Sequence, residues 1–157
     1  MCAFARGGYS RAMPTSREGV WRLRCDGGSR GNPGPGAFGF VLTDDSDREV
    51  EARGEYLGAV TNNVAEYRGL IAGLEAAAAH GAQSLEVSMD SELVVRQMTG
   101  EYRVKNEGLK PLHAAAKSAA ARIPRLRYTA VRREDNVRAD QLVNETLDRI
   151  LGSESPR

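Results

Sequence analysis

Residues 20–42 have the sequence VWRLRCDGGSRGNPGPGAFGFVL, in which two apolar segments flank a run rich in glycine and proline. Val20 to Cys25 alternates apolar and basic residues, which predicts a strand that Asp26 ends. The glycines and prolines of residues 27–36 predict a loop. Ala37 to Leu42 predicts a second strand, and the short connection favours antiparallel pairing with the first.

Beyond this hairpin, strands alternate with helices. After a polar turn, residues 48–57 predict a third strand. Apolar residues then recur every three or four positions, which is the pattern of an amphipathic helix; they are Val64, Tyr67, Ile71, Leu74 and Ala78. Further elements are expected at 85–89 (strand), 92–98 and 109–123 (helices), 126–130 (strand) and 136–151 (helix). The order βββαβααβα predicts an α/β fold: a five-stranded mixed sheet flanked by helices, with strands one to three antiparallel and strands four and five parallel to the first.

The length and pattern of the chain predict one domain over residues 20–152, with a short tail at 153–157. Residues 1–19 carry several arginines but no continuous apolar run. We expect a disordered tail there, with an organelle transit peptide as the alternative. No stretch is long and apolar enough for a membrane span, so we expect no membrane partner and a cytoplasmic location.

The formal net charge of +1 argues against binding nucleic acid through bulk positive charge. Binding would need local charge or metal ions. Arginines do gather late in the chain, at Arg122, Arg125, Arg127, Arg132 and Arg133. On charge alone, a solvated face is the favoured explanation of such a cluster.

Four carboxylates stand where the predicted fold would collect them. Asp26 and Asp90 end predicted strands, Glu66 lies in the first turns of a helix, and Asp140 lies on the inward shoulder of the last helix. Each alone has an ordinary explanation as a turn, cap or surface acid. Together they would repel one another unless hard divalent cations bound them. No Ser/His/Asp set, phosphate-binding GxxxxGK loop or HExxH zinc motif is present in the sequence.

Four segments are similar to the motifs of the type 1 ribonuclease H family, in the family's order and at its separations. They are DGGSRGNPGPG at 26–36, TNNVAEYRG at 61–69, MDSELVVRQ at 89–97 and NVRADQLVN at 136–144. The resemblance extends from about Trp21 to Leu151. It favours an archaeal- and actinobacterial-like subgroup, because the chain lacks the family's basic protrusion and its loop histidine; Arg133 stands in that loop instead.

The resemblance implies a ribonuclease H-like fold and an endoribonuclease that hydrolyses the RNA strand of RNA–DNA hybrids by a two-metal-ion mechanism, leaving 5′-phosphate and 3′-hydroxyl ends. Asp26, Glu66, Asp90 and Asp140 would be the catalytic ligands of two Mg²⁺ ions, for which Mn²⁺ can substitute. The substrate-binding residues would be Gly27, Asn32, Asn62, Asn63, Gln97 and Arg133. Amide side chains suit a minor groove that displays 2′-hydroxyls, although turn and cap chemistry is the alternative role for them.

Two other functions stay open from sequence alone. The chain could be another nuclease of the same fold, because related enzymes also use carboxylate clusters. It could also be a catalytically inactive module that binds hybrids or double-stranded RNA. Double-stranded RNA is a possible second substrate, because it shares the A-form shape. We expect a monomer.

Overall fold

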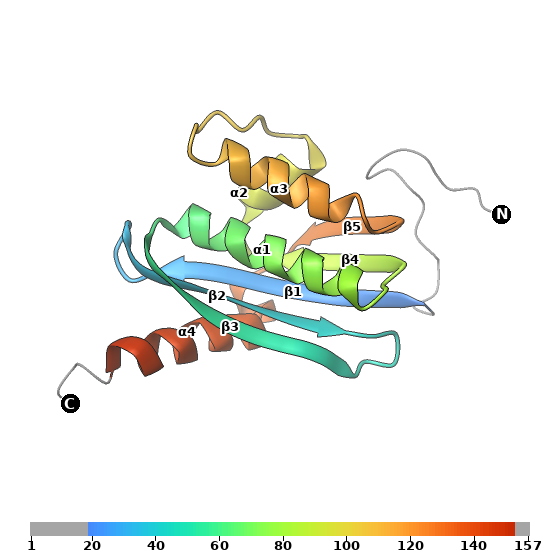
Figure 1. The fold of residues 1–157 in the computed structure, drawn as a ribbon, viewed down its shortest axis with the longest axis horizontal. Helices are drawn as coiled ribbons and strands as arrows, with labels where there is room; N and C mark the ends of the chain where they lie inside the picture. Colours follow the sequence, from blue (N-terminus) through green and yellow to red (C-terminus); the bar gives the residue numbers. More distant parts are fainter. Residues whose placement is uncertain (1–18, 153–157) are drawn as a thin grey trace.

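The computed structural model describes residues 19–152, which form a five-stranded sheet with helices on both faces (Figure 1). In chain order the elements are β1 (Val20–Ser29), β2 (Gly34–Thr43), β3 (Glu49–Val60), α1 (Asn62–Ala79), β4 (Ser84–Met89), α2 (Glu92–Thr99), α3 (Lys110–Ala120), β5 (Arg125–Ala130), a short 3₁₀ helix η1 (Arg133–Asp135) and α4 (Val137–Gly152). The expected tails, apart from Gly19, lie outside the described residues. Within residues 19–152, no helix is both long and apolar enough to cross a membrane.

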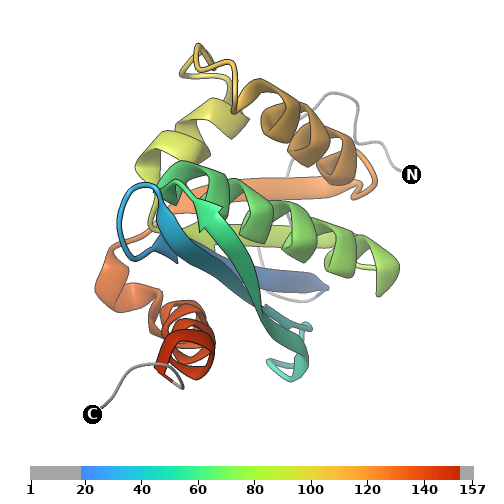
Figure 2. The same cartoon turned by 60° about the vertical axis from the view of Figure 1, so that its left-hand side comes forward.

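The strand order β3-β2-β1-β4-β5 confirms the predicted mixed sheet. β1, β2 and β3 pair antiparallel, while β4 pairs parallel with β1 and β5 pairs parallel with β4. Helices α1, α2 and α3 cover one face, and α4 lies alone on the other (Figures 1 and 2). β1 is therefore the central strand, covered by α1 on one side and by α4 on the other.

The predicted end of the first strand is wrong. β1 does not stop at Asp26 but continues to Ser29, because its ladder with β2 extends to the pair Ser29 and Gly36. The glycine-rich segment thus supplies the end of one strand and the start of the next, and only residues 30–33 form the turn. Glycine forms ladder hydrogen bonds like any other residue, so its presence did not interrupt the hairpin.

The buried face of α1 is also rotated from the predicted one. Tyr67 and Leu74 are fully buried as expected, but Val64, Ile71 and Ala78 are only partly buried. Small residues take the most buried positions instead: Ala65, Gly69, Gly73, Ala76 and Ala77, together with Leu70. A Cβ at Gly69 would lie 2.8 Å from the carbonyl oxygen of Asp26, so small residues let the helix approach β1 closely.

On the opposite face, α4 approaches the sheet along two glycines. Gly39 is paired with Asp26 in the β1–β2 ladder and with Gly54 in the β2–β3 ladder. A Cβ at Gly39 would lie 2.7 Å from the Cβ of Leu142 and 2.8 Å from the carbonyl oxygen of Ala139. The helix is therefore seated on the sheet level with Asp26.

Candidate active site

Asp26, Glu66 and Asp90 converge so closely that one oxygen from each lies within 4.8 Å of the others. The parallel pairing of β1 and β4 explains two of the three positions. Its last paired residues are Arg24 and Ser88, and Asp26 and Asp90 each follow two residues later. The two aspartates are therefore level with one another where β4 ends.

Glu66 is brought to this pair by α1. The helix begins after Thr61, whose side chain accepts a hydrogen bond from the Val64 amide, and Glu66 follows one turn later. Gly27 lets the helix come this close, since a Cβ there would overlap the carbonyl group of Ala65 and lie 2.5 Å from the Glu66 amide nitrogen. Gly27 is thus first a packing residue, a role that its predicted substrate contact did not anticipate.

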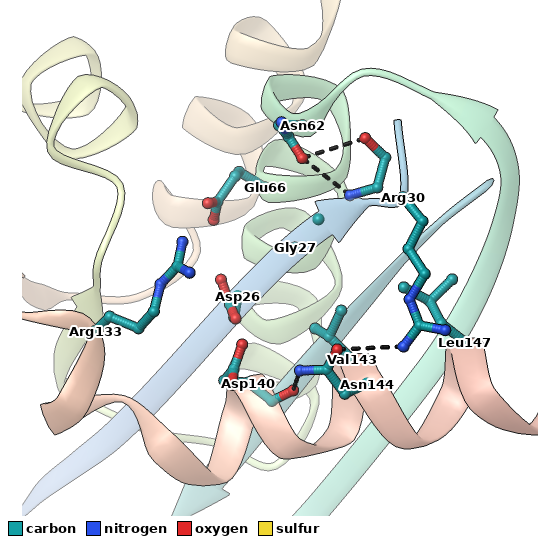
Figure 3. A pocket seen from close by; sticks show the side chains of 12 residues that line it. Asp26, Gly27, Arg30, Asn62, Glu66, Arg133, Asp140, Val143, Asn144 and Leu147 are labelled. Atoms are coloured by element: carbon teal, nitrogen blue, oxygen red, sulfur yellow. Dashed lines mark hydrogen bonds between the residues drawn. The ribbon is translucent and has the colours of Figure 1, made fainter. Parts of the chain in front are cut away.

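Asp140 reaches the same place from α4. It lines a groove of about 420 Å³ together with Asp26, Glu66 and Arg133, and the carboxylates of Asp26 and Asp140 point toward one another (Figure 3). Asp140 is not part of the tight group of three oxygens. The four predicted carboxylates are therefore brought together, three in mutual contact range and the fourth across the groove.

Burial and mutual repulsion make this cluster unfavourable without a positive ion. Burial, followed by the charge and a hydrogen bond of Asp90, raises the pKa of Asp26 to about 8. Burial and the charges of Asp26 and Asp90 also raise the pKa of Glu66 well above its ordinary value. Oε1 of Glu66 and Oδ1 of Asp90 are buried without a hydrogen-bond partner among the described residues.

The donor set fits hard divalent cations. All donors are carboxylate oxygens, which Mg²⁺ and Mn²⁺ prefer. The two unpartnered buried oxygens would be costly in a site that held no cation. The residues present therefore fit the metal that the resemblance implies.

Arg133 lies at the mouth of this groove. It belongs to η1, its side chain is 81% exposed, and its Nε is 3.5 Å from Oδ2 of Asp90. The charge of Arg133 partly offsets the rise in the pKa of Glu66. An exposed guanidinium beside the carboxylates leaves donors available to a phosphate.

Asn32 and Asn62 already hold the hairpin turn against the start of α1. Oδ1 of Asn32 accepts a hydrogen bond from the Asn62 amide at 2.9 Å. Oδ1 of Asn62 accepts from the amide of Ser29 at 2.9 Å and from its hydroxyl at 3.2 Å (Figure 3). Turn and cap chemistry therefore occupies the acceptor oxygens of both side chains.

Asn63 and Gln97 line a second groove, of about 620 Å³, between the start of α1 and the segment that joins α2 to α3. Gln97 is buried, and its Oε1 accepts a 2.6 Å hydrogen bond from the hydroxyl of Tyr67. The expected substrate residues therefore fall into three places. Gly27, Asn62 and Arg133 line the carboxylate groove, and Asn63 and Gln97 line the second one. Asn32 lines neither, but lies with Asn63 in a third groove of about 310 Å³.

Sequence reasoning missed residues on the α4 side of the carboxylate groove. Arg30 and Asn144 line it, with Val143 and Leu147 forming its apolar part (Figure 3). It also missed Asn136, which is buried at the start of α4. The available signal was the spacing of Asn136, Asp140 and Asn144, because residues four apart lie on one side of a helix.

Comparison with known proteins agrees with this geometry. A family model described as reverse transcriptase-like matches residues 24–146. A bifunctional protein of Mycobacterium tuberculosis is 46% identical over 127 residues, which are 80% of this chain and 35% of that protein. The chain thus spans about a third of the length of this curated relative.

Two solved structures are similar over nearly their whole length. Ribonuclease H1 of Halobacterium salinarum is 41% identical with a TM-score of 0.80, over 83% of this chain and 98% of that one. LC11 ribonuclease H1, solved in complex with an RNA/DNA hybrid, is 43% identical with a TM-score of 0.79, over 83% of this chain and 99% of that one. Fold, carboxylate site and matched sequence together define a ribonuclease H-like domain. The chain belongs to the reverse transcriptase-like family and, within it, to the type 1 ribonucleases H.

Proposed function

We propose that this protein is an endoribonuclease that hydrolyses the RNA strand of RNA–DNA hybrids. The observation that carries the proposal is the convergence of Asp26, Glu66 and Asp90 within 4.8 Å, with Asp140 across the same groove. Such a cluster has little value for stability, because its charges are buried and alike. Its retention in a chain of this family supports a catalytic role.

The four carboxylates would hold two divalent cations, Mg²⁺ or Mn²⁺. When bound, such ions activate a water molecule for attack on a phosphodiester and stabilise the leaving oxygen. Departure of the 3′ oxygen would leave 3′-hydroxyl and 5′-phosphate ends. The protein's own contribution is to fix the carboxylates on two strand segments and two helices, so that their geometry is set before substrate arrives.

Recognition of the hybrid is proposed for residues on either side of the carboxylates. Arg133 would contact a phosphate, and its exposure leaves it free to do so. Asn62 and Asn63, at the start of α1, would face the minor groove, where side-chain amides can both donate to and accept from 2′-hydroxyls. Gln97 would contact the hybrid from the second groove. Gly27, which lets α1 approach β1, and Asn32, which holds the hairpin turn against the start of α1, would also contact the hybrid.

One feature supports the hybrid as substrate, and a second supports a protein that acts as a single chain. LC11 ribonuclease H1, which resembles this chain over nearly its whole length, has been solved with an RNA/DNA hybrid. The four carboxylates gather within one copy of the chain, so the proposed site needs no residue of a second copy, and we propose action as a monomer.

The test is cleavage of four labelled substrates: RNA–DNA hybrid, double-stranded RNA, single-stranded RNA and double-stranded DNA. Each is incubated with Mg²⁺, Mn²⁺ or EDTA, and the product ends are mapped by treatment with phosphatase and ligase. We expect cleavage of the hybrid's RNA strand with either metal, none in EDTA, and ends that a ligase joins without prior phosphorylation. Cleavage of the DNA strand would favour another nuclease of the fold, and cleavage of double-stranded RNA would extend the substrate range.

A further inference from the structure

Asp140 differs from the other three carboxylates in how it is held. It lies on α4, which packs alone on its face of the sheet (Figure 2). Its carboxylate makes no hydrogen bond or ion pair with another residue in the range 19–152. Its distance from Asp26 therefore depends on how firmly α4 is fixed against β1.

Asn136 fixes the beginning of α4. Its side-chain Nδ2 donates a 3.0 Å hydrogen bond to the backbone carbonyl oxygen of Cys25, the residue before Asp26. Its own carbonyl oxygen accepts the amide of Asp140 at 3.1 Å. A continuous chain of two hydrogen bonds thus joins β1, at the position next to Asp26, to the backbone of Asp140.

This bond lies one residue beyond the end of the β1–β4 pairing. The pairing of β1 with β4 ends at Arg24 and Ser88, so Cys25 has no partner on β4. Asn136 is 1% exposed, and its Oδ1 is buried without a partner among the described residues. The unpartnered oxygen is costly, and the favourable contact that the buried amide makes in return is its bond to β1.

Asn144 holds the helix one turn after Asp140. Its Nδ2 donates to the carbonyl oxygen of Asp140 at 3.1 Å, and its Oδ1 accepts from Nη2 of Arg30 at 3.4 Å (Figure 3). The same Nη2 donates to Oδ1 of Asp148 at 2.8 Å. These contacts tie α4 to the β1–β2 turn, and their exposure makes them weaker than the buried bond of Asn136.

We propose that Asn136 and Asn144 are positioning residues that hold Asp140 at its working distance from Asp26, one helical turn before it and one turn after it. The inference rests on the proposed function, in which Asp140 is a cation ligand. Neither asparagine belongs to the carboxylate cluster. Each asparagine acts by positioning the Asp140 carboxylate. Removing an asparagine side chain should therefore weaken cation binding only while that carboxylate is present.

The test is a double-mutant cycle read first by Mn²⁺ binding, measured by calorimetry on metal-free protein without substrate. We expect Asn136→Ala to weaken Mn²⁺ binding roughly tenfold, as losses of residues that orient metal ligands do. Asn144→Ala should weaken it less. Asp140→Asn should weaken it at least as much as Asn136→Ala, and the Asn136→Ala/Asp140→Asn double variant should bind no worse than Asp140→Asn alone.

Ser84→Ala is the matched control, because Ser84 is buried at the far end of β4 and its hydroxyl accepts a 2.7 Å hydrogen bond from Nε of Arg125. It should lower the melting temperature and leave Mn²⁺ affinity unchanged. If Asn136→Ala does not fold, the cycle is run with Asn144→Ala. The same variants are then compared in kcat for hybrid cleavage. The double variant should again be no worse than Asp140→Asn alone.

Three results would overturn the inference: unchanged Mn²⁺ affinity in both asparagine variants, losses that multiply in the double variant, or an Asp140→Asn variant that binds Mn²⁺ like the wild type. A wild type that binds Mn²⁺ but never cleaves hybrid would contradict the proposed function. The binding cycle would still decide the positioning role in that case.

Discussion

Gly27 packs directly against the backbone of Ala65, the residue before Glu66. A Cβ at Gly27 would overlap the Ala65 carbonyl group, whereas a Cβ at Gly28 would meet nothing nearer than Oδ1 of Asn62 at 3.9 Å. This contact sets how close α1 comes to β1, and hence how close Glu66 comes to Asp26.

Gly27→Ala should therefore destabilise the protein by about 2–3 kcal/mol, because α1 must move away from a well-packed contact. Gly28→Ala, the matched control, should stay within about 1 kcal/mol of the wild type. Urea unfolding of both variants measures the difference. Equal stabilities would show that α1 does not depend on Gly27 for its position.

The stability of the metal-free protein should fall as pH rises. The pKa of Asp26 is about 8 in the folded protein against 3.8 as its ordinary value, so the folded state holds the extra proton between these values. For an acid with a raised pKa, stability is complete below the unfolded value and is lost as pH rises through the folded one. The raised pKa of Glu66 acts in the same direction.

Melting temperatures in EDTA from pH 4 to pH 9, for the wild type and Asp26→Asn, test this expectation. The neutral variant should match the wild type near pH 4 and melt at a higher temperature near pH 9. Mn²⁺ should stabilise the wild type more at pH 8 than at pH 5, because binding displaces protons. A difference in melting temperature between the wild type and Asp26→Asn that stays constant with pH would contradict the electrostatic account.

Tyr67→Phe should affect both stability and substrate binding. The change removes the 2.6 Å hydrogen bond to Oε1 of Gln97 in a buried place, which should cost about 1–3 kcal/mol. If Gln97 contacts the hybrid, its loosened amide should raise KM and leave kcat nearly unchanged. Tyr56→Phe, at a 38% exposed tyrosine of β3 that lines neither groove, is the control and should change neither quantity.

Arg133→Ala should weaken hybrid binding in a salt-dependent way. A side chain that contacts one phosphate contributes about one unit to the slope of log affinity against log salt, and its loss should reduce the slope by that amount. Arg132 is similarly exposed and is paired with Glu134, but unlike Arg133 it does not line the carboxylate groove, so Arg132→Ala is the control. Equal slopes for the wild type and Arg133→Ala would exclude the proposed phosphate contact.

Much of this architecture could be predicted from sequence, because it depends on local pattern. Alternating and helical periodicity gave the element order, and the four carboxylates followed from strand ends and helix faces. The glycines were misjudged. Gly27 was assigned to a loop and to substrate binding, and Gly39 and Gly69 were given no role, whereas all three allow helices to approach the sheet.

The missed contacts depend on distant parts of the chain. Asn136 binds the backbone of Cys25, 111 residues away, and nothing near Asn136 in the sequence indicates this contact. The predicted amides Asn32 and Asn62 form hydrogen bonds between the hairpin turn and the start of α1, which only the folded chain could reveal. The residue types at the candidate site could therefore be predicted from sequence, whereas the long-range contacts that hold them in place could not.

The most direct test of the central claim is the single-turnover rate of RNA-strand cleavage in an RNA–DNA hybrid with Mg²⁺, for the wild type and Asp90→Asn. Hybrid binding is measured in parallel. The account predicts cleavage by the wild type, a loss of about a thousandfold in the variant because several kcal/mol of cation stabilisation are removed, and hybrid binding by both. A wild type that binds the hybrid with Mg²⁺ but leaves it intact, or a variant that cleaves as fast as the wild type, would contradict it.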